Sequence, residues 1–153
     1  MPRFLSEVLG AVPVRGGKLL YVAFSGHIDR SLSYALERMC GLKVAPGIAA
    51  DSEFERAQAR FLATPAPRTR FLEAASARPM ARAIARLIES EKPVEARLAR
   101  IHECFWLRIW RRAADGPGLP PVDAVEDLLS TVGMVAGAEG GREGEAGGKI
   151  SAS

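Results

Sequence analysis

The chain has 153 residues, which is the length of one compact domain or of one domain with a tail. Its hydrophobic content of 48% and charged content of 25% are those of an ordinary globular protein, so a wholly disordered chain and a collagen-like or coiled-coil fibre are excluded. The net charge of +3 permits binding to nucleic acid or to acidic partners without requiring it, since a GC-rich coding sequence produces the same bias toward arginine.

The sequence contains no stretch that we expect to enter or cross a membrane. Its longest unbroken apolar run is 19–24, far short of the ~20 residues that span a bilayer. Glu7 interrupts the apolar stretch near the N-terminus, so we expect no signal peptide. Two cysteines are too few for a disulfide framework. A cytoplasmic protein is therefore the expectation.

The first elements form a β-hairpin preceded by a short helix. Residues 3–9 favour the helix. Residues 12–14 favour a short strand, and Pro13 restricts this strand to the edge of a sheet, or Pro13 itself to a strand start. Glycines at 16–17 favour a tight turn. The apolar run 19–24 follows, and such a run is typical of a strand buried on both faces.

A helix is expected over 30–40, where apolar residues recur at helical spacing. Asp29 is a suitable N-cap for it, because an aspartate side chain accepts hydrogen bonds from the first free amides of a helix. Gly41 is the expected end, since glycine adopts the left-handed conformation that closes many helices.

A third strand and a second helix complete a β-β-α-β-α order. The strand is predicted over 43–48, and the helix begins with Asp51 or Ser52 as its cap. Because a helix separates the strands at 19–24 and 43–48, we expect them to be parallel and joined by a right-handed crossover.

The remaining chain is divided by two stretches rich in proline and glycine, and we expect an α/β fold with one small mixed sheet followed by a helix and a hairpin. The predicted units are a module at 1–63, a linker at 64–76, a helix and β-hairpin at 77–112, a break with a terminal helix at 113–136, and a disordered tail at 137–153. A short strand is expected at 71–74 inside the linker, and hairpin strands at 94–101 and 104–111. The terminal helix is predicted over 122–132, where valines and leucines are in helical phase.

Catalytic and metal-binding patterns are weak. The stretch 143–150 comes nearest to a phosphate-binding loop but lacks the first glycine and the final hydroxyl residue. His102, Glu103 and Cys104 are neighbours in the sequence, yet adjacent hairpin residues point to opposite faces, which does not favour a catalytic arrangement. Cys40 fits a core position on an apolar helix face. Two histidines and two cysteines do not have the spacing of a zinc site. We therefore expect no enzymatic activity, metal or cofactor.

Arginine and aromatic residues are interleaved along the second hairpin, between residues 97 and 112. The residues considered as a surface there are Arg97, Arg100, Trp106, Arg108 and Trp110. A strand surface of this kind can stack single-stranded bases and hold phosphates. The competing interpretation is that the aromatics pack beneath the third helix while the arginines point to water. Nucleic-acid binding through this hairpin is thus the second hypothesis.

The first sixty residues resemble a known module. The matching positions are Val12–Arg15, Leu20–Phe24, Asp29, Gly41, Val44–Pro46 and Ser52–Phe61. This pattern is similar to the second half of the N-terminal domain of type II secretion and type IV pilus assembly ATPases, the secretion protein E family. The resemblance covers roughly residues 4–63, and residues 77–112 more loosely resemble the helix and hairpin that follow the module in stand-alone bacterial proteins. It implies an α/β fold that docks on a cytoplasmic protein of the membrane assembly platform.

The sequence also departs from that family. No Arg-Leu-Gly motif occurs, although the family carries it in tandem and in some members binds cyclic di-GMP through it. The Walker lysine and aspartate and the cysteine-rich zinc motif of the ATPase body are likewise missing. The resemblance therefore implies a regulatory or docking module with a protein partner, without the motor and without cyclic di-GMP. Contacts are expected either from the edge strand, through Val12 and Val14, or from the hairpin arginines.

Overall fold

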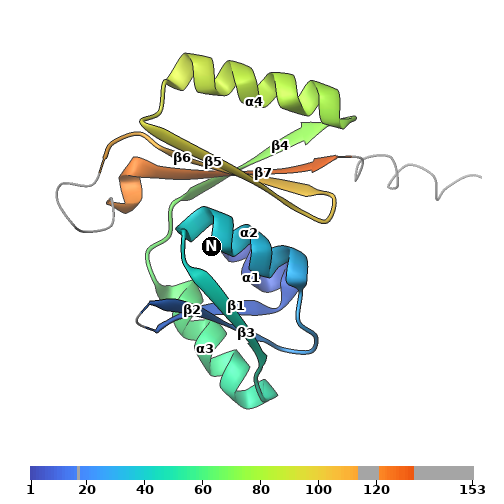
Figure 1. Cartoon of the computed structure of the whole chain (residues 1–153), viewed down its shortest axis with the longest axis vertical. Helices are drawn as coiled ribbons and strands as arrows, with labels where there is room; N and C mark the ends of the chain where they lie inside the picture. Colours follow the sequence, from blue (N-terminus) through green and yellow to red (C-terminus); the bar gives the residue numbers. More distant parts are fainter. Residues whose placement is uncertain (17, 114–120, 133–153) are drawn as a thin grey trace, which may run out of the picture.

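The computed structural model describes residues 1–16, 18–113 and 121–132, and over these ranges the chain is a mixed α/β structure with two sheets. The helices are α1 (Arg3–Leu9), α2 (Arg30–Cys40), α3 (Asp51–Ala63) and α4 (Ala77–Glu91), and the strands are β1 (Ala11–Gly16), β2 (Leu19–Phe24), β3 (Lys43–Ile48), β4 (Arg68–Ala74), β5 (Glu95–Ile101), β6 (Cys104–Trp110) and β7 (Val125–Val132). Figure 1 shows them in layers, with α4 on one sheet, α1 and α2 between the sheets, and α3 beyond the other sheet. The predicted α/β class is confirmed. Within the described ranges, no helix is long and apolar enough to cross a membrane.

The first sheet has the order β1-β2-β3 and follows the prediction closely. Strand β1 is antiparallel to β2, and β2 is parallel to β3. Asp29 caps α2, because its Oδ1 accepts the amide of Leu32 at 2.9 Å, and Gly41 ends the helix with a φ of 69°. The predicted cap of α3 is wrong: Ala50 occupies the N-cap position without a side-chain hydrogen bond. Asp51 instead lies in the first turn, where a negative charge favours the helix dipole.

The second sheet has the order β4-β7-β6-β5 and differs from the prediction at its first strand. The hairpin of β5 and β6 is confirmed, with the two strands antiparallel. The short strand expected at 71–74 is confirmed but begins earlier than expected, because β4 spans Arg68–Ala74 and runs parallel to β7. Only the linker assignment at 68–70 is wrong. The strand begins directly after Pro67 because no proline remains to interrupt the ladder.

The predicted terminal helix at 122–132 is also wrong. A short 3₁₀ turn at Val122–Ala124 leads into β7, which pairs with β4 on one side and β6 on the other. A strand between two neighbours is buried on both faces, so Leu128 and Leu129 are both apolar and do not alternate with polar residues. The apolar residues of β7 therefore have the same spacing as the buried face of a helix, which is why the sequence predicts a helix here. The predicted disordered tail at 137–153 lies outside the described residues.

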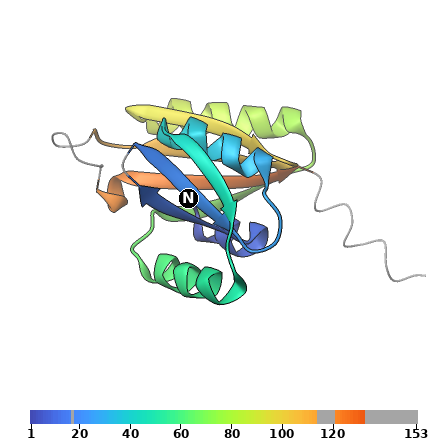
Figure 2. The ribbon, with the colours of Figure 1, turned by 60° about the horizontal axis from the view of Figure 1, so that its bottom comes forward.

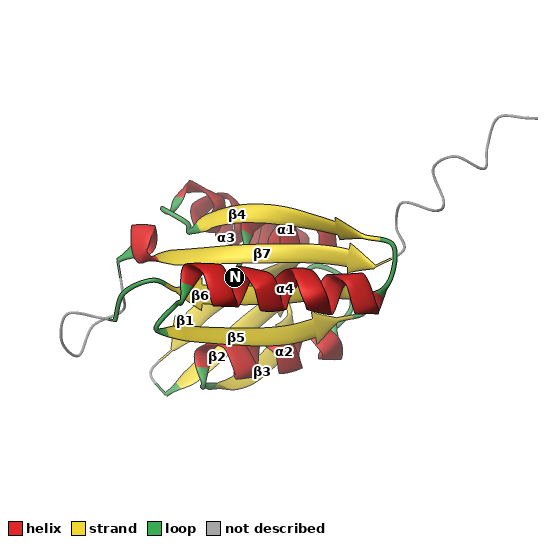
Figure 3. Cartoon of the chain, turned by 90° about the horizontal axis from the view of Figure 1, so that it is seen from above, coloured by secondary structure: helices red, strands yellow, loops and turns green. Residues whose placement is uncertain are grey.

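The two faces of the second sheet carry separate apolar clusters. Leu129 and Trp106 face α2 and join a cluster that also contains Val22 and Phe24 of the first sheet. Leu128 faces the other way, toward Met80 and its neighbours on α4. Figure 3 shows α4 lying on this sheet, roughly along its strands and between β7 and β5 in this view. Helix α2 is thus the layer through which the two sheets share a core.

Candidate functional site

Two of the predicted surface residues on the hairpin belong to the interior. Trp106 is 0% exposed, and its indole Nε1 donates to Asp127 Oδ1 at 2.7 Å. Arg108 donates through Nε and Nη2 to the two oxygens of Asp127, both at 2.7 Å, and its guanidinium lies over the Trp106 ring. Neither side chain is available to stack a base or to meet a partner. Both hold β6 to β7.

The other hairpin residues are engaged to different degrees. Arg97 donates from Nη1 to the carbonyl of Met39 at 2.8 Å, close to the end of α2, and lies over the ring of Trp110. Arg100 is the most open, with 61% of its side chain exposed and a 3.2 Å contact to Glu103. The exposed arginines of the hairpin are therefore isolated from one another, and Arg97 is used to bind the end of α2.

The predicted edge strand β1 does lie at the edge of its sheet, but its backbone is poorly suited to receive another strand. Ser6 Oγ donates to the carbonyl of Ala11 at 2.6 Å, and Pro13 has no amide hydrogen. Helix α3 covers one side of the first sheet (Figure 2). Val12 is 1% exposed, whereas Val14 is 48% exposed. Of this pair, only Val14 reaches the surface.

The residues considered for catalysis do not form a nucleophile with its base. The ring of His102 contacts Asp29 Oδ2 through Nε2 at 2.6 Å. Burial raises the pKa of the Cys104 thiol, which makes it a weak nucleophile at neutral pH. The prediction that Cys40 is a core residue is wrong, because it is exposed at the end of α2. Among the described residues no group of three potential metal ligands occurs.

The contact between Asp29 and His102 joins the cap of α2 to the turn of the β5–β6 hairpin. Burial acts to raise the pKa of Asp29, but the hydrogen bonds from the His102 ring and the Leu32 amide outweigh it, and the pKa falls below the usual 3.8. Since the folded pKa is the lower one, the ionised carboxylate stabilises the fold above the unfolded pKa. That contribution is lost as the pH falls through the folded value.

We expect Asp29→Asn to remove the part of the pH dependence of folding stability that comes from the Asp29 carboxylate. The variant should be less stable than the parent chain at pH 7, and the difference should shrink as the pH falls below 3.8. Urea unfolding measured at several pH values tests this, with Asp51→Asn, an exposed aspartate, as the matched control. A constant difference between the Asp29 variant and the parent across the acid range would contradict the prediction.

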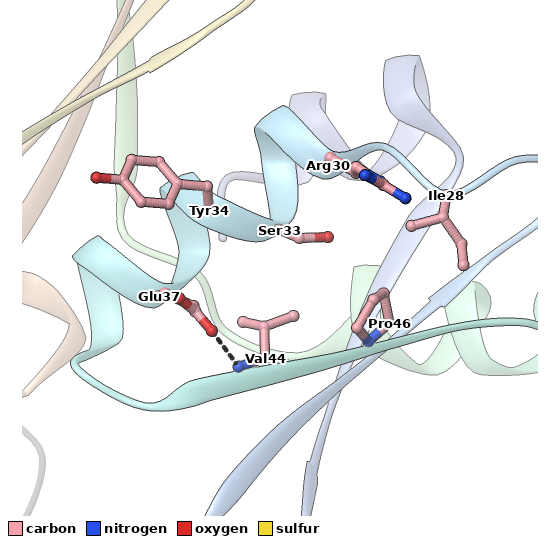
Figure 4. A pocket seen from close by; sticks show the side chains of 7 residues that line it. All are labelled: Ile28, Arg30, Ser33, Tyr34, Glu37, Val44 and Pro46. Carbon is pink, nitrogen blue, oxygen red and sulfur yellow. Dashed lines mark hydrogen bonds between the residues drawn. The ribbon is translucent and has the colours of Figure 1, made fainter.

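A groove of about 510 Å³ lies between α2 and β3, and none of the residues predicted as an interaction surface lines it. Its lining residues are Ile28, Arg30, Ser33, Tyr34, Glu37, Val44 and Pro46, shown in Figure 4. Apolar side chains on its walls remain open to solvent, since Tyr34 is 59% exposed and Ile28 is 39% exposed. It is an open groove with apolar walls and one charged residue of each sign.

The sequence builds this groove from the outer face of α2. Arg30, Tyr34 and Glu37 follow at intervals of four and three residues, so they share one helix face, opposite the buried Leu32 and Met39. This spacing was the signal that sequence reasoning missed. A tyrosine outside the apolar phase of an amphipathic helix points away from the core.

Strand β3 is the opposite wall and a sheet edge. Glu37 Oε1 accepts the amide of Val44 at 3.0 Å, as Figure 4 shows, and Pro46 on the same edge has no amide hydrogen. Lys43 adds a 3.7 Å ion pair to the other oxygen of Glu37. This edge is therefore blocked against an added strand, while the groove beside it stays open.

Comparisons of the chain with protein-family models, with curated proteins and with solved structures found no match.

Proposed function

We propose that the chain is a non-catalytic protein-interaction module that docks through the α2–β3 groove onto a cytoplasmic protein of a secretion or pilus assembly. The observation that carries this proposal is that two exposed apolar side chains, Tyr34 and Ile28, line one groove next to a blocked strand edge. The class of partner rests on the resemblance of residues 4–63 to the docking domain of secretion and pilus ATPases. The β-β-α-β-α order that the resemblance implies is the order of the elements from β1 to α3.

The chemistry of the groove indicates how a partner would bind. Large aromatic side chains are the residues that most often dominate protein interfaces, because a rigid ring buries much area at a low entropy cost. Tyr34 supplies such a ring, and Val44 and Pro46 supply an apolar wall. Arg30 and Glu37 lie two helical turns apart, so a partner segment would place an apolar side chain between an acidic and a basic one. Docking proceeds through side chains, since the backbone edge of β3 is blocked.

Nucleic-acid binding through the 97–112 hairpin is less well supported. The hypothesis needs exposed aromatic rings for stacking, and Trp106 is 0% exposed. Arg108 is held by Asp127, and Arg97 is held at the end of α2. Only Arg100 keeps a largely exposed side chain without such a structural bond to another element.

We expect Tyr34→Ala to weaken docking by about tenfold or more, the loss expected for a central aromatic contact. The tagged chain is used to capture partners from nuclease-treated lysate of its own organism, and the bound proteins are identified by mass spectrometry. Affinity is then measured with each recovered secretion or pilus component in purified form. Tyr21→Ala is the matched control, because Tyr21 is 49% exposed on the first sheet, outside the groove.

Two outcomes would contradict the proposal in different ways. If both tyrosine variants bind a recovered component as well as the parent chain does, the groove is not the docking site. If recovery of material disappears with nuclease treatment, the protein partner is refuted and nucleic acid takes its place.

A further inference from the structure

The outer face of α4 carries a row of arginines. Arg78, Arg82 and Arg86 are spaced four residues apart, so each is turned by only about 40° from the last and they share one face of the helix. Met80 and Ile84 lie on the opposite face and are buried against the second sheet. The three arginines are all exposed. They point directly away from the sheet that α4 covers.

This arginine row, residues 78, 82 and 86, is not neutralised within the structure. No ion pair between described residues includes any of the three. The first turn of α4 contains no acidic residue, so the positive end of the helix dipole adds to the charge of Arg78. Glu91, near the end of α4, faces inward and pairs with Arg70 of β4. Helix α4 lies at one end of the molecule (Figure 1). The row therefore places three positive charges there that have no ion pair among the described residues, and one exposed acid, Glu89, follows them on the same helix face.

We propose that the arginine row binds the phosphate backbone of nucleic acid without reading its bases. Arginine holds phosphates through paired N–H donors, and a row of cations gains affinity by releasing the counterions that phosphates condense. Successive arginines rise about 6 Å along the helix, which sets them along the direction of a charged backbone. Ala81 and Ala85 lie beside the row, and their small side chains allow the nucleic-acid backbone to approach α4 closely.

The surface around the row favours phosphates over the other anionic partners. A helix that lies in a membrane surface inserts an apolar face, and a protein interface centres on bulky apolar anchors. Among the described residues, the exposed large hydrophobic side chains include none from α4. A phosphate backbone requires neither feature, because charge and hydrogen-bond donors are sufficient for it. This inference goes beyond the proposed docking function, since it uses α4 and not the α2–β3 groove.

The experiment is a titration of the full chain with a labelled oligonucleotide of about 20 nucleotides, single-stranded and duplex, followed by fluorescence anisotropy from roughly 50 to 200 mM salt. We expect both forms to bind and the affinity to fall steeply with salt. Arg82→Gln/Arg86→Gln should reduce the slope of log affinity against log salt by about 1.8 for the duplex and about 1.4 for the single strand, because each lost phosphate contact removes about 0.9 and about 0.7, respectively. The matched control is Arg56→Gln/Arg60→Gln, an exposed pair with the same spacing on α3, at the other end of the molecule.

Thermal melting followed by circular dichroism establishes that both double variants fold like the parent chain. An equal loss of affinity in the two double variants would overturn the proposal, because net charge alone would then explain binding. Absence of binding at the lowest salt would overturn it as well. Binding to vesicles of anionic lipid without binding to either oligonucleotide would replace nucleic acid by a membrane surface. These outcomes are separate from the Tyr34 experiment, which measures protein capture.

Discussion

Replacing Asp127 with alanine should lower the free energy of unfolding by about 3–5 kcal/mol, which is the loss expected when one partner of a buried ion pair is removed. Asp127 is 0% exposed and accepts hydrogen bonds from Arg108 and from the Trp106 indole. Without the carboxylate, the guanidinium of Arg108 stays largely buried with an uncompensated charge, and a buried N–H loses its acceptor. The sum of these costs makes Asp127 one of the most sensitive polar positions in the described chain.

Urea unfolding followed by tryptophan fluorescence measures this loss, because Trp106 reports directly on the site. The matched control is Asp123→Ala, which removes the exposed ion pair with Arg112 and should cost roughly 0–1 kcal/mol. Equal losses in the two variants would contradict the prediction. A double change, Arg108→Met with Asp127→Leu, should recover the part of the loss that comes from the uncompensated charge, since apolar residues of similar volume often replace buried ion pairs without loss. The part that comes from the Trp106 indole N–H should remain, because leucine offers it no acceptor.

The helices were the part of the fold that the sequence determined most clearly. Apolar residues at helical spacing predicted α2 with its observed bounds and a helix in the 77–112 unit, where α4 lies. The capping roles of Asp29 and Gly41 followed from local chemistry alone. These signals are local, because a helix forms its hydrogen bonds within one segment. Residue spacing within that segment is therefore useful evidence, although the same spacing at Val125–Val132 belongs to a strand.

Strand β7 shows why the remainder could not be predicted. Its place between β4 and β6 depends on pairing with segments far away in the sequence, and burial on both faces removes the alternation that identifies a strand. The acids Glu126 and Asp127 also favour a solvent-exposed assignment, yet both are buried because arginines from other strands neutralise them. Such partners are visible only when the fold is known.

The residues of the candidate site divide in the same way, into those that local spacing predicts and those that depend on contacts with distant segments. The outward position of Tyr34 was available from the helical phase of α2, whereas the groove requires β3 to lie beside that helix. The arginines of the hairpin have the composition of a surface, but Arg108 and Arg97 are used by distant acceptors, Asp127 and the carbonyl of Met39. The composition shows which residues carry charge, but it does not show which of these side chains the fold leaves without a bonding partner.

The two sheets share one apolar core. Leu129 of β7 is 0% exposed and belongs to the same apolar cluster as Val22 and Phe24 of β2. Leu129→Ala should therefore cost about 2–5 kcal/mol, the usual range for a leucine removed from a packed core. Leu98→Ala is the control, because Leu98 is 42% exposed on β5 and its truncation should cost about 1 kcal/mol or less.

The sharper consequence of this shared core is cooperativity. If α2 couples the sheets, Leu129→Ala lowers the hydrogen-exchange protection of β2 amides as much as that of β6 amides, although β2 belongs to the other sheet. A single unfolding transition should accompany this uniform loss. Loss of protection confined to β4–β7 would show that the sheets unfold independently, and the segment 1–63 would then be a self-sufficient module. Uniform loss would mean that the groove on α2 depends for its stability on residues more than sixty positions further along the chain, since Leu129 packs into the same cluster as Leu32 and Met39.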